Sequence, residues 1–166
     1  CRRGSLSVNS MEVMSEEIAY TIINLMEGVT QSGSGVRLRS SGASYPDKIV
    51  TGYPYGFKNP IAGKTGTTQN QSDGWFIGMV PNLSTGVWVG AEDRAVHFPD
   101  LNRGQGATMA LPIWALYMKK CYADKDLQVS TGSFKRPEML NINVDCYGQD
   151  EESTDPEKKV EEDLEF

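Results

Sequence analysis

Apolar residues recur at helical spacing near the start of the chain. Ser15 is a suitable N-cap, and Glu16 and Glu17 follow in the first turn, where the helix dipole favours negative charge. The apolar positions after them are Ile18, Ile22, Leu25, Met26 and Val29. Gly28 and the run Ser32–Gly35 are signals for the helix end. The pattern predicts an amphipathic helix that faces the core.

A second helical pattern covers residues 106–122. Its apolar face consists of Met109, Ile113, Trp114, Tyr117 and Met118. Lys119 and Lys120 suit the C-terminal end of a helix, where positive charge is favoured. Pro112 either lies in the first turn or kinks the helix.

Between these helices the pattern is typical of extended chain. Residues 61–68 form a first predicted strand, residues 73–80 a second that is apolar on both faces, and residues 85–91 a third. The short connections favour an antiparallel meander. Four glycines indicate that a large element packs tightly on the sheet: Gly74, Gly78, Gly86 and Gly90. The expected fold class is α+β, an antiparallel sheet of three or more strands packed by helices.

The remaining segments are less regular. Val36–Arg39 could be a short strand, and the residues up to 59 form a loop with turn signals. Its aromatic residues, Tyr45, Tyr53, Tyr55 and Phe57, either pack against the core or line a substrate wall. Residues 92–105 are expected to form a polar loop, and its His97 is the single histidine of the chain. We interpret that histidine as a surface or packing residue rather than a catalytic base.

Charge separates the C-terminal end from the rest. Residues 150–166 contain nine acidic residues and two lysines, a charge of −7, whereas the whole chain carries −6, so the other residues come to about +1. We predict an acidic disordered tail at 150–166, a loosely attached extension at 123–149 and a domain at 1–122. The nearly neutral body offers no electrostatic basis for binding nucleic acid.

Composition narrows the remaining classes of function. No long apolar run suggests a membrane span, so we expect these residues to be soluble. Three cysteines and one histidine do not match a zinc site, and neither a metal nor a cofactor is expected. A disulfide between Cys121 and Cys146 would require an oxidising compartment. Because the first residue is Cys1 rather than Met, we expect a piece of a longer protein.

The candidate chemistry lies in Gly63-Lys64-Thr65-Gly66-Thr67-Thr68. On a strand, Lys64 and Thr68 share one face, while Thr65 and Thr67 share the other. Gly66 leaves room for a ligand or another backbone to approach. A cation, hydroxyl groups and open backbone suit an anionic, peptide-like ligand. The alternative is a polar edge strand on which lysine discourages aggregation.

Two other readings of the motif fit poorly. A phosphate-binding loop needs a glycine at position 58, which is Lys58, and a helix directly after the motif, where a strand and turn are predicted. Ser-His-Asp catalysis is disfavoured because His97 has no Gly-x-Ser-x-Gly nucleophile elbow to serve.

The motif and its surroundings resemble the C-terminal half of the transpeptidase domain of class A (bifunctional) penicillin-binding proteins. The resemblance covers about residues 12–122. It is carried by Ala62–Asn70, Asp73–Gly78 and Gly86–Gly90, with Ser15–Tyr20, Gly33–Gly35 and the segment from Gly106 to Met118 as supporting matches. It implies a partial penicillin-binding-protein or β-lactamase-like fold.

That family cross-links peptidoglycan by acyl transfer. A serine attacks the D-Ala-D-Ala bond of a stem peptide, and an amine of another stem peptide then takes the acyl group; β-lactams mimic the stem peptide. The resemblance implies that Lys64 supplies positive charge and that the N–H of Thr67 is an oxyanion-hole donor. It also places Thr65, Gly66, Thr67 and Thr68 against the substrate, with the strand edge pairing to it.

The family's nucleophile motif, Ser-x-x-Lys, is not in this sequence. Its second element, Ser-x-Asn, occurs as Ser7-Val8-Asn9, which we interpret as coincidence because it lies too close to Lys64. We therefore expect the chain to be inactive alone and to need the N-terminal half of the domain. The alternatives are a non-catalytic interaction module or a half-domain completed by a second chain.

The resemblance also implies a setting for the parent protein. It would lie at the bacterial inner membrane, facing the periplasm, and would also carry a peptidoglycan glycosyltransferase. Because the family's sheet has two further strands, this chain should expose an unpaired sheet edge and apolar surface, and dimerisation through that edge is a reasonable expectation.

Overall fold

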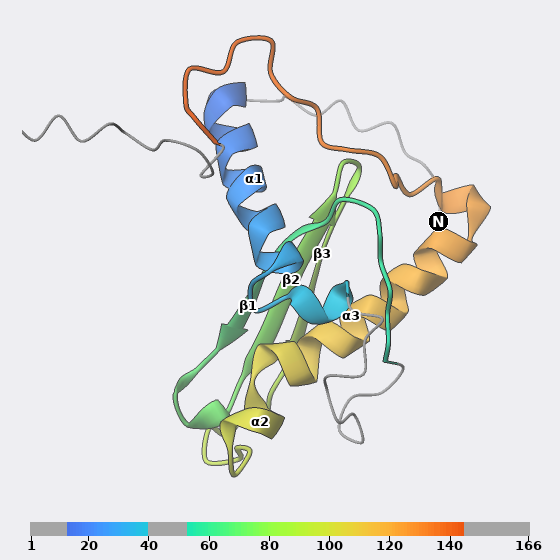
Figure 1. Ribbon diagram of the computed structural model, residues 1–166. Coiled ribbons are helices and arrows are strands. Elements are labelled where there is room, and N and C mark those ends of the chain that lie inside the picture. Colours follow the sequence, from blue (N-terminus) through green and yellow to red (C-terminus); the bar gives the residue numbers. More distant parts are fainter. Residues whose placement is uncertain (1–12, 40–52, 145–166) are drawn as a thin grey trace, which may run out of the picture.

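A computed structural model describes residues 13–39 and 53–144 of the chain. In that part, three strands form an antiparallel sheet in the order β1-β2-β3, with α3 crossing one face and α1 beside β1 (Figure 1). The longer elements are α1 (Glu16–Gln31), β1 (Ala62–Thr67), β2 (Gly74–Val80), β3 (Leu83–Val89) and α3 (Gly106–Ala123). The shorter ones are η1 (Val36–Leu38), η2 (Gln69–Gln71), α2 (Leu101–Gly104) and η3 (Lys125–Leu127). The predicted α+β meander is confirmed.

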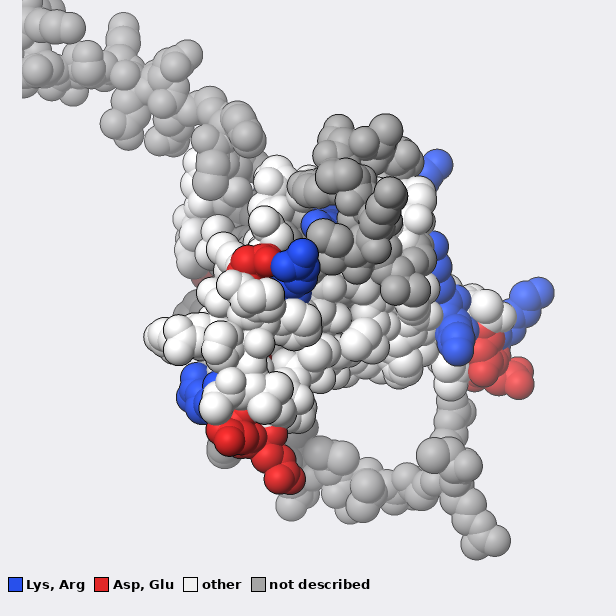
Figure 2. Space-filling model, turned by 90° about the horizontal axis from the view of Figure 1, so that it is seen from below, with Lys and Arg blue, Asp and Glu red and all other residues white. Residues whose placement is uncertain are grey.

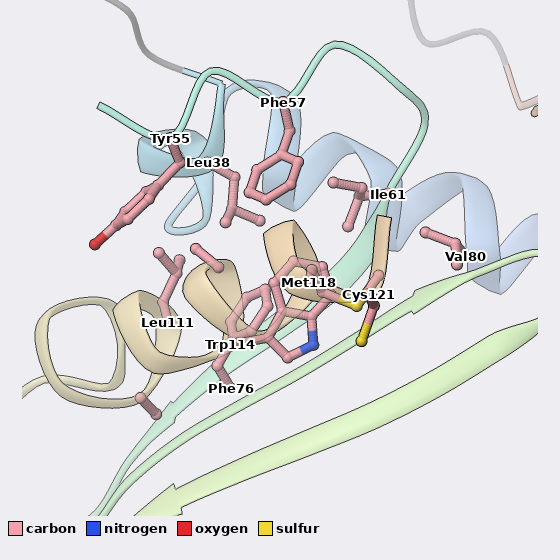
Figure 3. Close-up of a cluster of buried hydrophobic side chains, with 12 residues drawn as sticks. Leu38, Tyr55, Phe57, Ile61, Phe76, Val80, Leu111, Trp114, Met118 and Cys121 are labelled. Carbon is pink, nitrogen blue, oxygen red and sulfur yellow. The ribbon is translucent and has the colours of Figure 1, made fainter. Parts of the chain in front are cut away.

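The core lies between α3 and one face of the sheet. Phe76 of β2 and Trp114 of α3 are fully buried, with their ring centroids 5.1 Å apart. The indole N–H of Trp114 also donates a hydrogen bond to the Thr85 hydroxyl of β3 at 2.7 Å. Figure 3 shows side chains from the helix, the sheet and the segment before β1 meeting in this cluster. The helix is therefore fixed to the sheet by burial and by a polar contact.

Glycines let α3 approach the sheet closely. A Cβ atom at Gly78 would lie 2.5 Å from the Trp114 ring, and one at Gly74 would lie 2.3 Å from the Met109 side chain. These two positions confirm the prediction of a large element packed on the sheet. Gly86 does not, because its nearest neighbour is Ile77 at 3.5 Å on the other face.

The opposite face of the sheet is open in the described part of the chain. Trp75, Ile77 and Trp88 lie on it, each between 43% and 47% exposed. The two tryptophan rings are 6.3 Å apart and sit on paired residues of β2 and β3. β2 is thus apolar on both faces, as predicted, but only one face is covered.

Helix α1 begins at the predicted cap, where the Ser15 hydroxyl accepts a hydrogen bond from the Ile18 N–H. The helix continues past Gly28 to Gln31 and contacts β1. The prediction that its apolar face meets the core is wrong for Ile18, Ile22 and Leu25, which are 43% to 63% exposed. Thr30 is its one buried residue.

Polar contacts at the end of α1 tie it to the chain before β1. The Thr30 hydroxyl donates to the Ile61 carbonyl at 2.6 Å. Arg39 donates to the Thr30 hydroxyl and to the carbonyls of Phe57 and Asn59. Burial raises the pKa of Glu27, an effect that the attraction of Arg39 opposes. The α1 end is therefore anchored by hydrogen bonds where apolar burial is small.

Other local predictions need correction. Val36–Leu38 form a 3₁₀-helix rather than a strand, with the Leu38 N–H bonded to the Gly35 carbonyl. The predicted loop 92–105 contains the one-turn helix α2, which Asp100 caps by accepting from the Arg103 N–H. Pro112 lies beyond the first turn of α3, and the helix continues through it.

After η3, the described residues 128–144 contain no helix or strand. The segment returns toward the start of α1 (Figure 1), where the Glu17 carboxylate accepts hydrogen bonds from the N–H groups of Asn141 and Ile142. Asn82 of the β2–β3 turn contacts Gln128 and Ser130. The predicted acidic tail lies outside the described residues. In the described part, no helix is long and apolar enough to cross a membrane.

Candidate functional site: the outer edge of β1

Lys64 lies on one face of β1, whereas Thr65 and Thr67 lie on the other, as predicted. Lys64 is opposite Ile77 on the open face, whereas Thr65 is opposite Phe76 on the face that α3 covers. Thr67 shares that second face, opposite Gly74. A ligand that contacts both Lys64 and the threonine hydroxyls would therefore lie along the strand edge between the two faces.

The backbone direction along β1 identifies which N–H groups reach that edge. The Thr68 N–H donates to the Asp73 carbonyl at 3.1 Å and so points toward β2. Backbone groups alternate in direction along an antiparallel strand, so those of Thr65 and Thr67 point away from β2. β1 is a terminal strand of the described sheet, and its outer edge is where an extended peptide could pair.

The Lys64 ammonium group lies at this same edge. Its Nζ donates a hydrogen bond to the Thr65 carbonyl at 2.9 Å, and that carbonyl is one of the outward-pointing groups. Lys64 is exposed. The Cβ of Lys64 lies on the open face, but its ammonium group reaches the outer edge of β1, near the N–H groups of Thr65 and Thr67 that point away from β2.

The two threonine hydroxyls on the covered face already have protein partners. The Thr65 hydroxyl lies 2.7 Å from the Ser34 hydroxyl, in the turn after α1. The Thr67 hydroxyl accepts a hydrogen bond from the Gly106 N–H, the first of α3, at 3.0 Å. Gly106 fits there because a Cβ would lie 2.4 Å from the carbonyls of Gly66 and Trp75. Each hydroxyl retains bonding capacity for a ligand, since a hydroxyl has one proton and two lone pairs.

Thr68 is also predicted to contact substrate, and its hydroxyl lies at the turn between β1 and β2. It donates to the Asp73 carboxylate at 3.1 Å and accepts from the Asp73 N–H at 3.0 Å. The other carboxylate oxygen of Asp73 accepts from the indole N–H of Trp88 at 3.0 Å. Hydrogen bonds from Trp88, Thr68 and Ser72, together with the charge of Arg94, lower the pKa of Asp73, although desolvation opposes them.

Sequence reasoning missed the supporting residues Ser34, Asp73, Trp88 and Gly106 as parts of this site. All four occur in the segments that carried the family resemblance, which was the available signal. Their contacts span 15 to 39 positions in the chain, apart from the local Thr68–Asp73 pair, so no short motif reveals them.

The other candidates lie elsewhere. His97 is exposed, and its Nδ1 is 3.0 Å from the neighbouring Phe98 carbonyl. Tyr55 and Phe57 are buried in the core, while Tyr45 lies outside the described residues. Cys121 is free and buried, and its suggested partner Cys146 is outside the described part. Among residues 13–39 and 53–144, no group of three or more His, Cys, Asp or Glu could hold a metal ion.

Charged side chains form separate small groups of both signs on the face seen in Figure 2.

The sequence that contains this site matches a known protein family. The family model described as the penicillin binding protein transpeptidase domain matches residues 6–100, more than half of the chain. The chain belongs to the penicillin-binding protein transpeptidase family. It corresponds to part of that domain in a class A protein. The matched range includes all of β1, β2 and β3.

Individual relatives agree. Penicillin-binding protein 1A of Aquifex aeolicus is 31% identical over 136 residues, which are 80% of this chain and 15% of the relative. The protein of that name from Neisseria gonorrhoeae is 29% identical over 150 residues, 89% of this chain and 16% of the relative. A crystal structure of penicillin-binding protein 1A from Haemophilus influenzae superposes with a TM-score of 0.53 at 27% identity, covering 78% of this chain and 17% of that one. The chain thus spans about a sixth of the length of these relatives.

Proposed function

We propose that the outer edge of β1 forms the carboxylate and oxyanion side of a peptidoglycan D,D-transpeptidase site, in a parent protein that also supplies the nucleophile. The observation that carries the proposal is the position of the Lys64 ammonium at the edge where the Thr67 N–H points outward. Membership of the transpeptidase family supports the same reading.

In this proposal a stem peptide that ends in D-Ala-D-Ala, or a β-lactam, lies along the edge of β1. Its backbone pairs with the outward groups of the strand, as in strand addition. Its carboxylate meets Lys64 and the hydroxyls of Thr65 and Thr67. Gly66 removes a side chain where the ligand passes.

The chemistry that these residues supply is electrostatic. Attack of a serine on the carbonyl carbon creates a negatively charged oxygen, and the Thr67 N–H stabilises that charge as an oxyanion-hole donor. Loss of one such donor typically costs about 10²–10³ in rate. Lys64 contributes positive charge to the carboxylate and to the proton-transfer network around the serine.

The test is the acylation of the complete parent protein by a fluorescent penicillin. Lys64→Ala should reduce the acylation rate by about 10²-fold or more, in the range seen when a catalytic donor is removed. Lys120→Ala, at an exposed position of α3, is the matched control and should leave the rate unchanged. An unchanged rate in Lys64→Ala would remove Lys64 from the mechanism.

We further propose that the chain of residues 1–166 alone forms no acyl-enzyme. No serine in the sequence is followed by lysine three positions later, so the nucleophile pair of the family is missing. Incubation of this chain with fluorescent penicillin should give no labelled band on a denaturing gel. A covalent adduct would contradict the proposal.

The open face of the sheet supports a need for a covering partner. Trp75, Ile77 and Trp88 are each between 43% and 47% exposed in the described residues, which is unfavourable for an isolated chain. We propose that the N-terminal half of the domain covers this surface and that the isolated chain self-associates instead. Light scattering should show a dimer or larger species, and an intact monomer would count against this.

A further inference from the structure

Asp73 uses its whole carboxylate at the turn that follows β1. Oδ1 accepts the indole N–H of Trp88 at 3.0 Å, and Oδ2 accepts the hydroxyls of Thr68 and Ser72 at 3.1 and 3.3 Å. Its own N–H donates to the Thr68 hydroxyl at 3.0 Å. These hydrogen bonds form a network that joins the end of β1, the start of β2 and the end of β3.

The glycine at position 90 leaves space for the Asp73–Trp88 hydrogen bond. A Cβ atom at Gly90 would lie 2.4 Å from Asp73 Oδ1 and 2.6 Å from the Trp88 ring, so a side chain there would separate the pair. The Trp88 ring also lies beside Trp75 on the open face. Three side-chain donors therefore bond the Asp73 carboxylate at the turn between β1 and β2.

The network lies directly beside the proposed oxyanion donor. Thr68 follows Thr67, and its backbone N–H and its hydroxyl are both tied to Asp73. On the other side, the Thr67 hydroxyl is held by the Gly106 N–H of α3. Hydrogen bonds therefore restrain Thr67 on two sides. The Thr67 hydroxyl is bonded to α3, and the next residue, Thr68, is bonded to Asp73.

We infer that Thr68, Asp73 and Trp88 are positioning residues that hold the Thr67 N–H in its orientation for acyl transfer. The inference rests on the proposed function. A hydrogen bond to an ionised carboxylate is stronger than one between neutral groups, and the three side-chain donors to Asp73 together restrict the end of β1. Precise placement matters because a displacement of about 1 Å can cost on the order of 10²-fold in rate.

The test uses the complete parent protein and separates rate from binding. Thr68→Val keeps the shape of the side chain but removes the hydroxyl. Trp88→Phe keeps an aromatic ring but removes the indole N–H. For each variant, stopped-flow acylation by a penicillin yields the saturating acylation rate constant and the apparent dissociation constant.

We expect both variants to lower the saturating rate constant, Thr68→Val by roughly tenfold and Trp88→Phe by less, with little change in the apparent dissociation constant. These losses are smaller than the 10²–10³-fold expected on loss of an oxyanion donor, because the donor is displaced rather than removed. Thr68→Ser, which restores the hydroxyl, should recover most of the rate lost in Thr68→Val.

Three results would overturn the inference. One is an unchanged saturating rate constant in folded Thr68→Val or in Trp88→Phe. The second is a loss in Thr68→Ser as large as that in Thr68→Val. The third is a change confined to the dissociation constant. If Thr68→Val does not fold, Trp88→Phe decides the matter, since that side chain is half exposed.

The same measurements separate this inference from the proposed function. If the parent is acylated and Lys64→Ala abolishes acylation while Thr68→Val and Trp88→Phe keep the wild-type rate, only the positioning role fails. If Lys64→Ala is acylated normally, the proposed site itself fails, whatever the other variants do.

Discussion

The two faces of the sheet are built from similar residues but differ in what covers them. On the α3 face, Phe76 is fully buried against Trp114, and glycines allow close contact. On the other face, Trp75, Ile77 and Trp88 are equally apolar but nearly half exposed. The pattern of apolar residues along a strand therefore does not distinguish a covered face from an open one. It shows that a face is apolar, but not whether another element packs against it.

The largest difference is expected between adjacent residues of β2. In the isolated chain, Phe76→Ala should lower the free energy of unfolding by about 3–5 kcal/mol, because it leaves a cavity beside Trp114. At concentrations low enough to keep the chain monomeric, Ile77→Ala should cost below about 1 kcal/mol, since its side chain is already 45% exposed. Urea unfolding followed by circular dichroism measures both, and equal losses would show that the open face is buried in solution.

A smaller difference is expected between two glycines. Gly78→Ala should destabilise the chain by about 1–3 kcal/mol, because the new Cβ would overlap the Trp114 ring. Gly86→Ala on the open face should change stability by no more than about 0.5 kcal/mol, since the nearest atom is 3.5 Å away. Thermal unfolding of the two variants tests this. A neutral Gly78→Ala would mean that α3 does not rest tightly on the sheet.

The smallest effect concerns Asp73, which holds Trp88 by hydrogen bonding instead of burial. Its pKa is lowered in the folded state, chiefly by the Trp88 hydrogen bond. The carboxylate therefore adds stability at pH values above its unfolded pKa of about 3.9, and this contribution is lost as the pH falls through the lower folded value.

Accordingly, wild type should be more stable than Asp73→Asn at pH 7, and the difference should shrink below about pH 4. Urea unfolding at several pH values measures it, with Asp126→Asn at an exposed position as the control. A difference that stays constant from pH 7 to pH 3 would show that the charge of Asp73 does not contribute.

Much of this structure follows from local patterns. The three strands, the cap at Ser15 and the long helix after Gly106 were predicted because alternation, helical spacing and capping act within a few residues. The opposite faces of Lys64 and Thr65 follow in the same way from strand geometry. The segment Val36–Leu38 was mispredicted because its apolar residues alternate over only a few positions, and the Gly35 carbonyl closes a 3₁₀ turn instead.

The site was harder to predict than the fold. The motif around Lys64 was visible in the sequence, but the partners of its threonines were not. Ser34 and Gly106 reach Thr65 and Thr67 from positions 31 and 39 residues away, through the packing of α1 and α3 on β1. The contact of the Thr68 hydroxyl with Asp73 was likewise not predicted from the motif.

By itself, the sequence determined the two long helices, the three strands, their antiparallel order and the residues that carry charge and hydroxyl groups, since these depend on short-range sterics and periodicity. Only the tertiary structure decided which sheet face α3 covers, that α1 leaves Ile18, Ile22 and Leu25 exposed, and that the Lys64 ammonium reaches the outer edge of β1. These features depend on contacts between residues that are far apart in the sequence, and such contacts form only when the helices and strands pack together.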